Sequence, residues 1–132
     1  MNTNKNLTIE ETFNLAIKNH QENKIDIAQE LYNQVLKVDP NHLGALNNLG
    51  VLYKKLNQIQ KAINCYEKVI QIDPNNIDTH YNLGNALKEL GENQKAISSY
   101  EKAIEIEPNH LKALYNLGNA LKELGENQKA KD

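Results

Sequence analysis

The chain of 132 residues has little of what cross-links or anchors many proteins: one cysteine, three prolines, six glycines and no tryptophan. The single cysteine, Cys65, excludes an intramolecular disulfide. No apolar run approaches the length of a membrane span. The polar start from Met1 to Thr8 lacks the apolar core of an export signal. We therefore expect a cytoplasmic protein with no membrane partner.

Charge and composition exclude further classes of function. Lysine and arginine together number 15 against 17 acidic residues, which gives a net charge of −2, and the two signs are interspersed. With six tyrosines and one phenylalanine, the chain has no basic stripe with stacking rings, so nucleic acid is not an expected partner. Cys65 and the histidines lack metal-ligand spacing, so we expect packing or loop positions for them and no metal or cofactor. The histidines are His20, His42, His80 and His110.

What the chain does contain is a repeat. Three triplets of an acidic residue, proline and asparagine place prolines at positions 40, 74 and 108, a constant step of 34 residues. A unit of this length holds two antiparallel helices but no independent core, so each unit must stack on its neighbours. The chain divides into a polar segment 1–8, the full units 9–42, 43–76 and 77–110, and a partial unit 111–132.

Each unit is predicted to form two helices, because its apolar residues recur at steps of three and four in two runs. Asparagine or glycine recurs between the two runs, and these residues best tolerate the left-handed backbone that closes a helix. We expect that conformation at Asn23, Asn57, Gly91 and Gly125.

The helix ends carry signals of their own. Each proline ends the second helix of its unit, because proline disfavours helical geometry in the residue before it. The asparagine after each proline is expected to cap the next helix; these are Asn41, Asn75 and Asn109. At the start of the chain, Thr8 and Glu11 fit a capping box.

These residues resemble the tetratricopeptide repeat, whose pattern has a large residue, Leu-Gly, an aromatic, alanine, an aromatic, alanine and proline at fixed intervals. The second unit matches it with Leu46, Leu49, Gly50, Tyr53, Ala62, Tyr66, Val69 and Pro74. The third matches it with His80, Leu83, Gly84, Leu87, Ala96, Tyr100, Ala103 and Pro108. The resemblance covers residues 9–132 and implies an all-α fold, an α-α superhelix (solenoid) of about 3.5 repeats.

The first unit departs from the pattern and is similar to a terminal cap. It has Ala16 for the glycine and Asn19 for the aromatic, and Lys18 and Glu22 stand where later units have apolar residues. Polar residues at these places are expected of a terminal repeat, which has no preceding neighbour to cover.

A helical wheel places one stripe of each first helix opposite its core face. The sixth place of the unit is asparagine in all four units, and its amide matches a peptide group's donor and acceptor. Helices about 10 Å apart would offer one such amide to roughly every third residue of an extended peptide. The candidate groove residues are Asn14, Asn48, Asn82, Asn116, Asn85, Asn119, Lys55, Lys112, Val51 and Glu89.

Two family grooves are relevant to this stripe. The resemblance implies that the first helices line a concave groove, and the stretches that begin at Asn82 and Asn116 are similar to repeats of O-linked N-acetylglucosamine transferase. The family's carboxylate clamp, which holds acidic chaperone tails, is matched only by Asn82 and Lys112. Its other places hold Asn47, Val51 and Asn116. The alternative reading of the asparagines is a solvated or intrahelical role without a ligand.

The fourth unit supplies only the opening of its second helix, and residues 81–96 recur unchanged at 115–130. We expect an uncovered apolar flank on its first helix, which favours continuation into more repeats or a homodimer through this helix.

The leading hypothesis is a noncatalytic scaffold whose concave groove binds an extended peptide or a partner helix. The alternatives are the substrate-docking part of a larger enzyme, such as a glycosyltransferase, and a structural self-assembly module. We expect no catalysis by this chain, because it shows no nucleophile motif and no phosphate-binding glycine loop.

Overall fold

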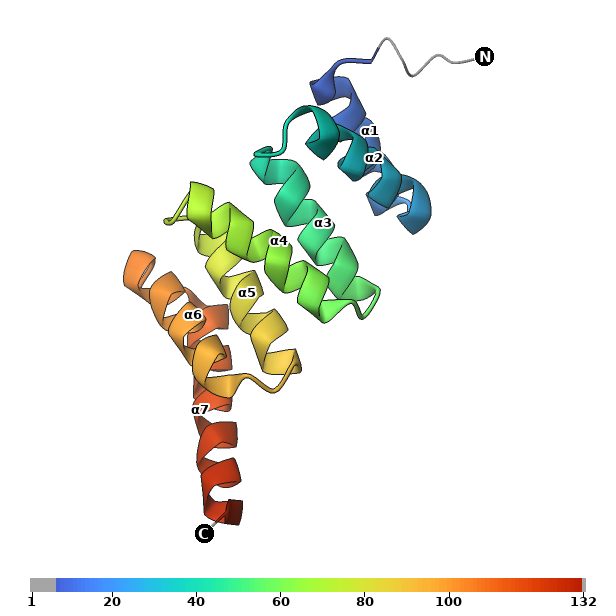
Figure 1. Cartoon of the computed structure of the whole chain (residues 1–132). Coiled ribbons are helices and arrows are strands. Elements are labelled where there is room, and N and C mark those ends of the chain that lie inside the picture. The colour runs from blue at the N-terminus through green and yellow to red at the C-terminus, as the bar shows by residue number, and fades with distance from the viewer. Residues whose placement is uncertain (1–6, 132) are drawn as a thin grey trace.

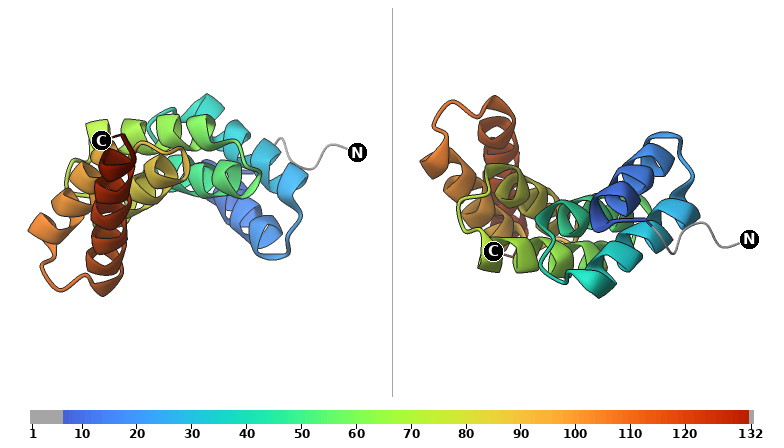
Figure 2. Two further views of the ribbon diagram at one scale, coloured as in Figure 1. Left: turned by 90° about the horizontal axis from the view of Figure 1, so that it is seen from below. Right: turned by 90° about the horizontal axis from the view of Figure 1, so that it is seen from above.

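The computed structural model describes residues 7–131, and within them the chain forms seven helices and no strand. The helices follow one another in antiparallel pairs (Figure 1). Their bounds are α1 Ile9–Gln21, α2 Ile25–Val38, α3 Leu43–Lys55, α4 Ile59–Ile72, α5 Ile77–Glu89, α6 Asn93–Ile106 and α7 Leu111–Lys131. The stack bends into an arc, with the odd-numbered helices on its inner side and the even-numbered helices outside (Figure 2). The expected all-α superhelix is confirmed.

Each of the three full repeats has one buried tyrosine at its centre. Tyr32, Tyr66 and Tyr100 lie on the outer helices α2, α4 and α6 and are almost completely buried. In the second and third repeats the ring packs directly on a glycine of the inner helix. A Cβ at Gly50 or Gly84 would stand 2.6 Å from Cε1 of Tyr66 or Tyr100. The glycine of the Leu-Gly pair in the repeat pattern is therefore required by this close approach.

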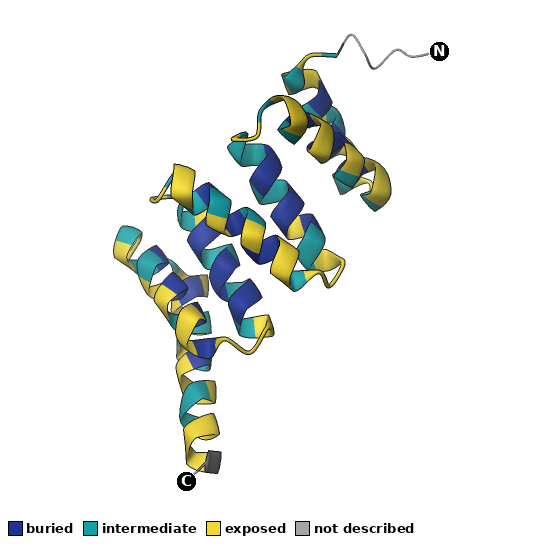
Figure 3. Cartoon of the chain, viewed as in Figure 1, coloured by how far each residue is buried: buried dark blue, intermediate teal, exposed yellow. Residues whose placement is uncertain are grey.

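The buried residues form two clusters that run along the stack, and burial is densest on α3 and α5 (Figure 3). These central inner helices have neighbours on both sides, whereas α7 is covered only by the preceding repeat. The polar residues Lys18, on α1, and Glu22, its C-cap, are exposed, as the sequence of the first repeat predicts.

The predicted left-handed turns form at three of the four expected places. Asn23, Asn57 and Gly91 have φ of 63°, 61° and 85°. The prediction at Gly125 is wrong, because α7 continues through this residue to Lys131 as one helix of 21 residues. In the third repeat, residues after 96 such as Tyr100 and Ala103 pack back on the stack and stabilise the turn. The described residues after Gly125 include no large apolar side chain, so the helix simply continues.

The predicted asparagine caps are wrong by one residue. The cap of α3 is His42, whose Nδ1 accepts a hydrogen bond from the Ala45 backbone N–H at 3.0 Å, and His110 does the same for Ala113. Asn76 caps α5 through the Thr79 N–H. The residue directly after proline remains in the turn instead. The capping box of Thr8 and Glu11 is confirmed, with reciprocal hydrogen bonds of 3.0 and 2.9 Å.

Candidate functional site

The four ladder asparagines lie at equivalent places on α1, α3, α5 and α7, the helices of the inner face (Figure 2). Asn14 is exposed, and the other three, Asn48, Asn82 and Asn116, are half-buried. The four asparagines occupy the same position on their helices, but they are buried to different extents because the residues around them differ. The asparagines therefore cannot act as four identical contacts.

Asn116 is tied into a network between the third and fourth repeats. Its Nδ2 donates to the Tyr81 hydroxyl at 3.2 Å and to Oδ1 of Asn85 at 2.9 Å. The same Asn85 oxygen accepts a hydrogen bond from the Tyr100 hydroxyl. Both amide hydrogens of Asn116 are thus used within the protein, and its carbonyl oxygen is what it can offer a ligand. These bonds run from α7 to α5, so the role of Asn116 is neither purely solvated nor intrahelical.

The buried phenols beneath the inner face stay protonated. Burial raises the pKa of Tyr100 to about 12, the nearby Tyr81 acts in the same direction, and the Asn116 amide opposes the change. Burial also raises the pKa of Tyr32, and a hydrogen bond with Asn48 lowers it in part. At neutral pH these hydroxyls keep their protons and have no role as bases, and that of Tyr100 donates to Oδ1 of Asn85.

A hollow of about 370 Å³ opens where α3, α5 and α7 approach one another. It contains three of the predicted groove residues. Its lining is Lys54, Asn85, Lys88, Glu89, Asn116 and Glu123. Asn119 belongs to a neighbouring hollow of about 280 Å³, lined by Lys88, Asn119, Lys122, Glu123 and Glu126. Asn85, Asn116 and Asn119 are thus gathered with Glu89 on one continuous, polar part of the inner face.

The remaining predicted residues lie apart from these hollows. Nζ of Lys55, on α3, donates to Oδ1 of Asn23 at 3.0 Å and so links α3 to the turn between α1 and α2. Val51 is 40% exposed and gives the second repeat an apolar spot where the third has Asn85. Lys112 is exposed near the start of α7. The N-terminal half of the predicted stripe is therefore less polar and less hollowed than the C-terminal half.

Sequence reasoning missed a column of lysines. Lys54, Lys88 and Lys122 occupy the twelfth place of successive repeats, and all three line the hollows. Nζ of Lys54 lies 3.8 Å from a carboxylate oxygen of Glu89, which is the thirteenth residue of the next repeat. The signal was available, because lysine recurs at a constant step of 34 residues. Lysine and glutamate side chains therefore lie among the asparagine amides on this part of the inner face.

The histidines serve packing and capping. The ring of His20 lies edge-on to Tyr32, with Nδ1 3.0 Å from the phenol oxygen. Burial lowers the pKa of His20, and the charge of Lys55 acts in the same direction. Nε2 of His80 is 2.7 Å from the Pro74 carbonyl oxygen, and His42 and His110 cap helices. No group of three metal-binding side chains occurs among the described residues.

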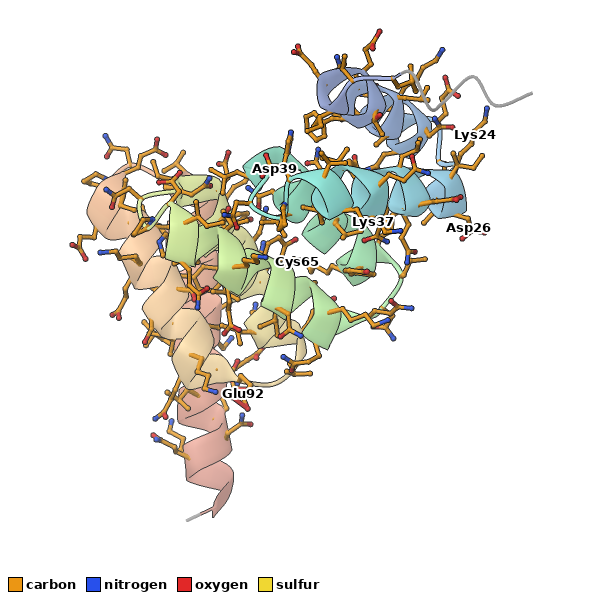
Figure 4. All side chains as sticks on the ribbon, turned by 45° about the horizontal axis from the view of Figure 1, so that its top comes forward. Lys24, Asp26, Lys37, Asp39, Cys65 and Glu92 are labelled. Carbon is orange, nitrogen blue, oxygen red and sulfur yellow. The ribbon has the colours of Figure 1, made fainter. Side chains whose placement is uncertain are left out.

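Cys65 lies half-buried on α4 (Figure 4). Burial raises the pKa of its thiol to about 11, with Lys68 opposing the shift. A thiol of this kind is a poor nucleophile at neutral pH.

The outer surface of the described chain carries charges of both signs. Lys24, Asp26, Lys37 and Asp39 lie along α2 and its two ends (Figure 4), so both signs alternate there. None of the described helices combines the length and the apolar character that crossing a bilayer requires.

The comparisons with known proteins agree with the repeat geometry. A profile described as TPR repeat matches residues 52–91 and 84–125, and one described as Tetratricopeptide repeat matches residues 31–64. None of the curated proteins matches the chain.

Solved structures share the fold. A crystal structure of MamA is 31% identical, over 87% of this chain and 67% of that chain, with a TM-score of 0.81. The first TPR of Spaghetti (RPAP3), bound to the HSP90 peptide SRMEEVD, is 20% identical over 89% and 93% of the two chains, with a TM-score of 0.85. A mutant of the Thermobaculum terrenum O-GlcNAc transferase is 27% identical, over 92% of this chain but 23% of that one, with a TM-score of 0.78. The chain belongs to the tetratricopeptide repeat family.

Proposed function

We propose that this protein is a noncatalytic scaffold that binds an extended segment of another protein along its inner face. The observation that carries this proposal is the polar surface on α3, α5 and α7, where an asparagine amide and a lysine recur with the repeat and glutamates accompany the lysines on α5 and α7. An extended peptide presents one donor and one acceptor per residue, and side-chain amides can pair with both. Because the inner helices are fixed by packing, such contacts would form without reordering the protein.

The charges favour a peptide of little net charge. The two hollows are lined by three lysines, Lys54, Lys88 and Lys122, and by three glutamates, Glu89, Glu123 and Glu126. A strongly acidic ligand would meet the glutamates as well as the lysines. The chain also contains no arginine, so it lacks the side chain that holds a carboxylate with two parallel hydrogen bonds. We therefore expect the peptide SRMEEVD to bind weakly.

Asn82 is the residue on which a test should focus, because it is half-buried at the centre of the inner face. An array of extended peptides is probed with the natural chain and with Asn82→Ala. Asn64→Ala, on the outer helix α4, is the matched control because it removes the same amide from the other side. The proposal predicts loss of the selected peptides with Asn82→Ala and retention with Asn64→Ala. Equal binding by all three proteins would contradict it.

The second candidate is a docking unit within a larger enzyme. It is favoured by the match to the O-GlcNAc transferase, in which a chain like this one spans 23% of the whole. The groove would then hold the substrate of a catalytic domain encoded elsewhere in the same gene. The gene sequence on both sides of residues 1–132 tests this candidate, since a reading frame with no catalytic domain on either side excludes it. Homodimerisation through α7 and a cytoplasmic location remain predictions.

A further inference from the structure

Another hollow, of about 410 Å³, lies between the outer helices α4 and α6, which flank α5 (Figure 1). We call it the outer hollow. It shares no lining residue with the two hollows of the inner face. Buried apolar side chains form its floor and exposed charged side chains form its rim. The floor includes Ile63, Leu83 and Leu87, and the rim includes Glu67, Glu92 and Lys95.

The equivalent place one repeat earlier is filled by the ring of Tyr53. This side chain packs against both buried clusters, and Nζ of Lys61 lies 5.6 Å from the centre of its ring. Burial raises the pKa of Tyr53, Cys65 acts in the same direction, and the Asn33 amide opposes the change. The ring and hydroxyl of one tyrosine thus occupy the space between the first and second repeats.

Between the second and third repeats this tyrosine is missing, but its surroundings remain. A step of 34 residues from Tyr53 leads to Leu87, which has neither a ring nor a hydroxyl. The lysine over the ring is again a lysine, Lys95, and the amide beside the phenol is replaced by the carboxylate of Glu67. Both residues line the outer hollow. The hollow therefore has the surroundings of a tyrosine without the tyrosine.

The charges at the rim favour a neutral hydroxyl over an anion. Nζ of Lys95 lies 3.6 Å from a carboxylate oxygen of Glu92, whereas Glu67 forms no ion pair with any residue that the structure describes. A free carboxylate accepts a hydrogen bond from a phenol O–H, and a charged acceptor strengthens such a bond. A phosphate group would be repelled by the two glutamates. A basic residue beside the bound ring would be attracted by them.

We propose that the outer hollow binds a tyrosine side chain of a partner protein, flanked there by lysine or arginine. The ring lies on Leu87 and next to Lys95, and the hydroxyl donates to Glu67. The ammonium group adds the attraction of a cation for an aromatic face. This site is separate from the inner face, so the scaffold can hold a second partner while a peptide lies in its groove.

The test is an NMR titration of the labelled full chain with an acetylated, amidated peptide of sequence Ala-Lys-Tyr-Lys-Ala. The readout is the methyl signals of Ile63, Leu83 and Leu87. The proposal predicts saturable shifts, binding about fivefold weaker when phenylalanine replaces tyrosine, and no shifts with phosphotyrosine. The absence of saturable shifts at these methyl groups would overturn the proposal. Equal affinity for the tyrosine and phenylalanine peptides would overturn it too.

Two variants locate the contact. Glu67→Ala should weaken the tyrosine peptide about fivefold and leave the phenylalanine peptide unchanged, because only the tyrosine loses a hydrogen bond. Glu101→Ala is the matched control, since Glu101 holds the same place on α6 and lies outside the hollow. A tyrosine affinity that Glu67→Ala leaves unchanged would contradict the assigned contact.

Leu87→Tyr should abolish binding of the peptide, because it fills the hollow as Tyr53 fills the preceding one. The result from Glu67→Ala still decides if this larger side chain unfolds the protein. Sedimentation of the natural chain is run in parallel. A dimer that Leu87→Tyr dissociates without unfolding would overturn the proposal, because a second copy would then occupy the hollow.

Discussion

The ring of Tyr66 lies so close to Gly50 that a methyl group at that glycine would stand 2.6 Å from Cε1 of the tyrosine. Tyr66 is 1% exposed and has no free space to move into. Gly50→Ala is therefore expected to destabilise the protein, because overpacking of about 1–3 kcal/mol exceeds the gain of up to about 1 kcal/mol from replacing a helical glycine. Urea denaturation measures the difference. Gly118→Ala is the control and should be neutral or stabilising, and equal effects of the two changes would contradict this packing.

Gly91 and Gly125 are the same residue in identical local sequences, and the structure gives them opposite roles. Gly91→Ala should destabilise by about 1–2 kcal/mol, because φ is 85° there and alanine resists left-handed geometry. Gly125→Ala should stabilise α7 by up to about 1 kcal/mol. Thermal unfolding of both variants tests the difference. Gly91→Asn should destabilise the protein less than Gly91→Ala, because asparagine adopts the same left-handed conformation at Asn23 and Asn57. Destabilisation by Gly125→Ala would instead indicate that Gly125 forms a turn.

The capping box predicts a dependence of stability on pH. The pKa of Glu11 is lowered by hydrogen bonds from the Thr8 backbone and side chain. Because the folded state has the lower pKa, this contribution is complete above the ordinary glutamate pKa and is lost as pH falls through the lowered value. Glu11→Gln should flatten part of the acid limb of the stability curve. Thr8→Ala should cost about 1 kcal/mol at neutral pH. An unchanged acid limb in Glu11→Gln would contradict the assignment.

Cys65 should react slowly with alkylating agents. With its pKa raised to about 11 by burial, little thiolate exists at pH 8. Iodoacetamide is expected to modify the native protein at least about tenfold more slowly than the protein unfolded in urea. Cys65→Ser should be tolerated, because Ser99 occupies the equivalent place on α6. Equal rates in the native and unfolded protein would show that the thiol is not protected.

Most of the fold could be predicted from the sequence, because the structure that short stretches of the chain favour is also the structure that stacking of the repeats requires. The positions of the first helices, the left-handed residues Asn23 and Asn57 and the capping box of Thr8 all come from interactions within a few residues. The straight course of α7 could not be predicted this way. Residues 81–96 and 115–130 are identical, so the choice between turn and helix depends on how the residues C-terminal to each stretch pack.

The candidate site was predictable in register but not in detail. A helical wheel finds the residues that share the inner face, such as Asn85 and Asn116, but it does not reveal that they bond to each other and to Tyr100. Those bonds join different repeats and depend on how the helices stack. The hollow that Lys54 and Glu89 line arises in the same way.

The measurement that most directly tests the inner-face account is a two-dimensional NMR titration of the labelled chain with a peptide selected on the array. The account predicts that the side-chain amide signals of Asn82 and Asn119, and the backbone signals of α3, α5 and inner-facing α7 residues, shift in proportion to bound peptide. Signals from α2 and α4 should stay in place. Shifts confined to the outer helices, or to the exposed apolar residues Leu114 and Leu121 of α7, would contradict the claim that the inner face is the binding surface.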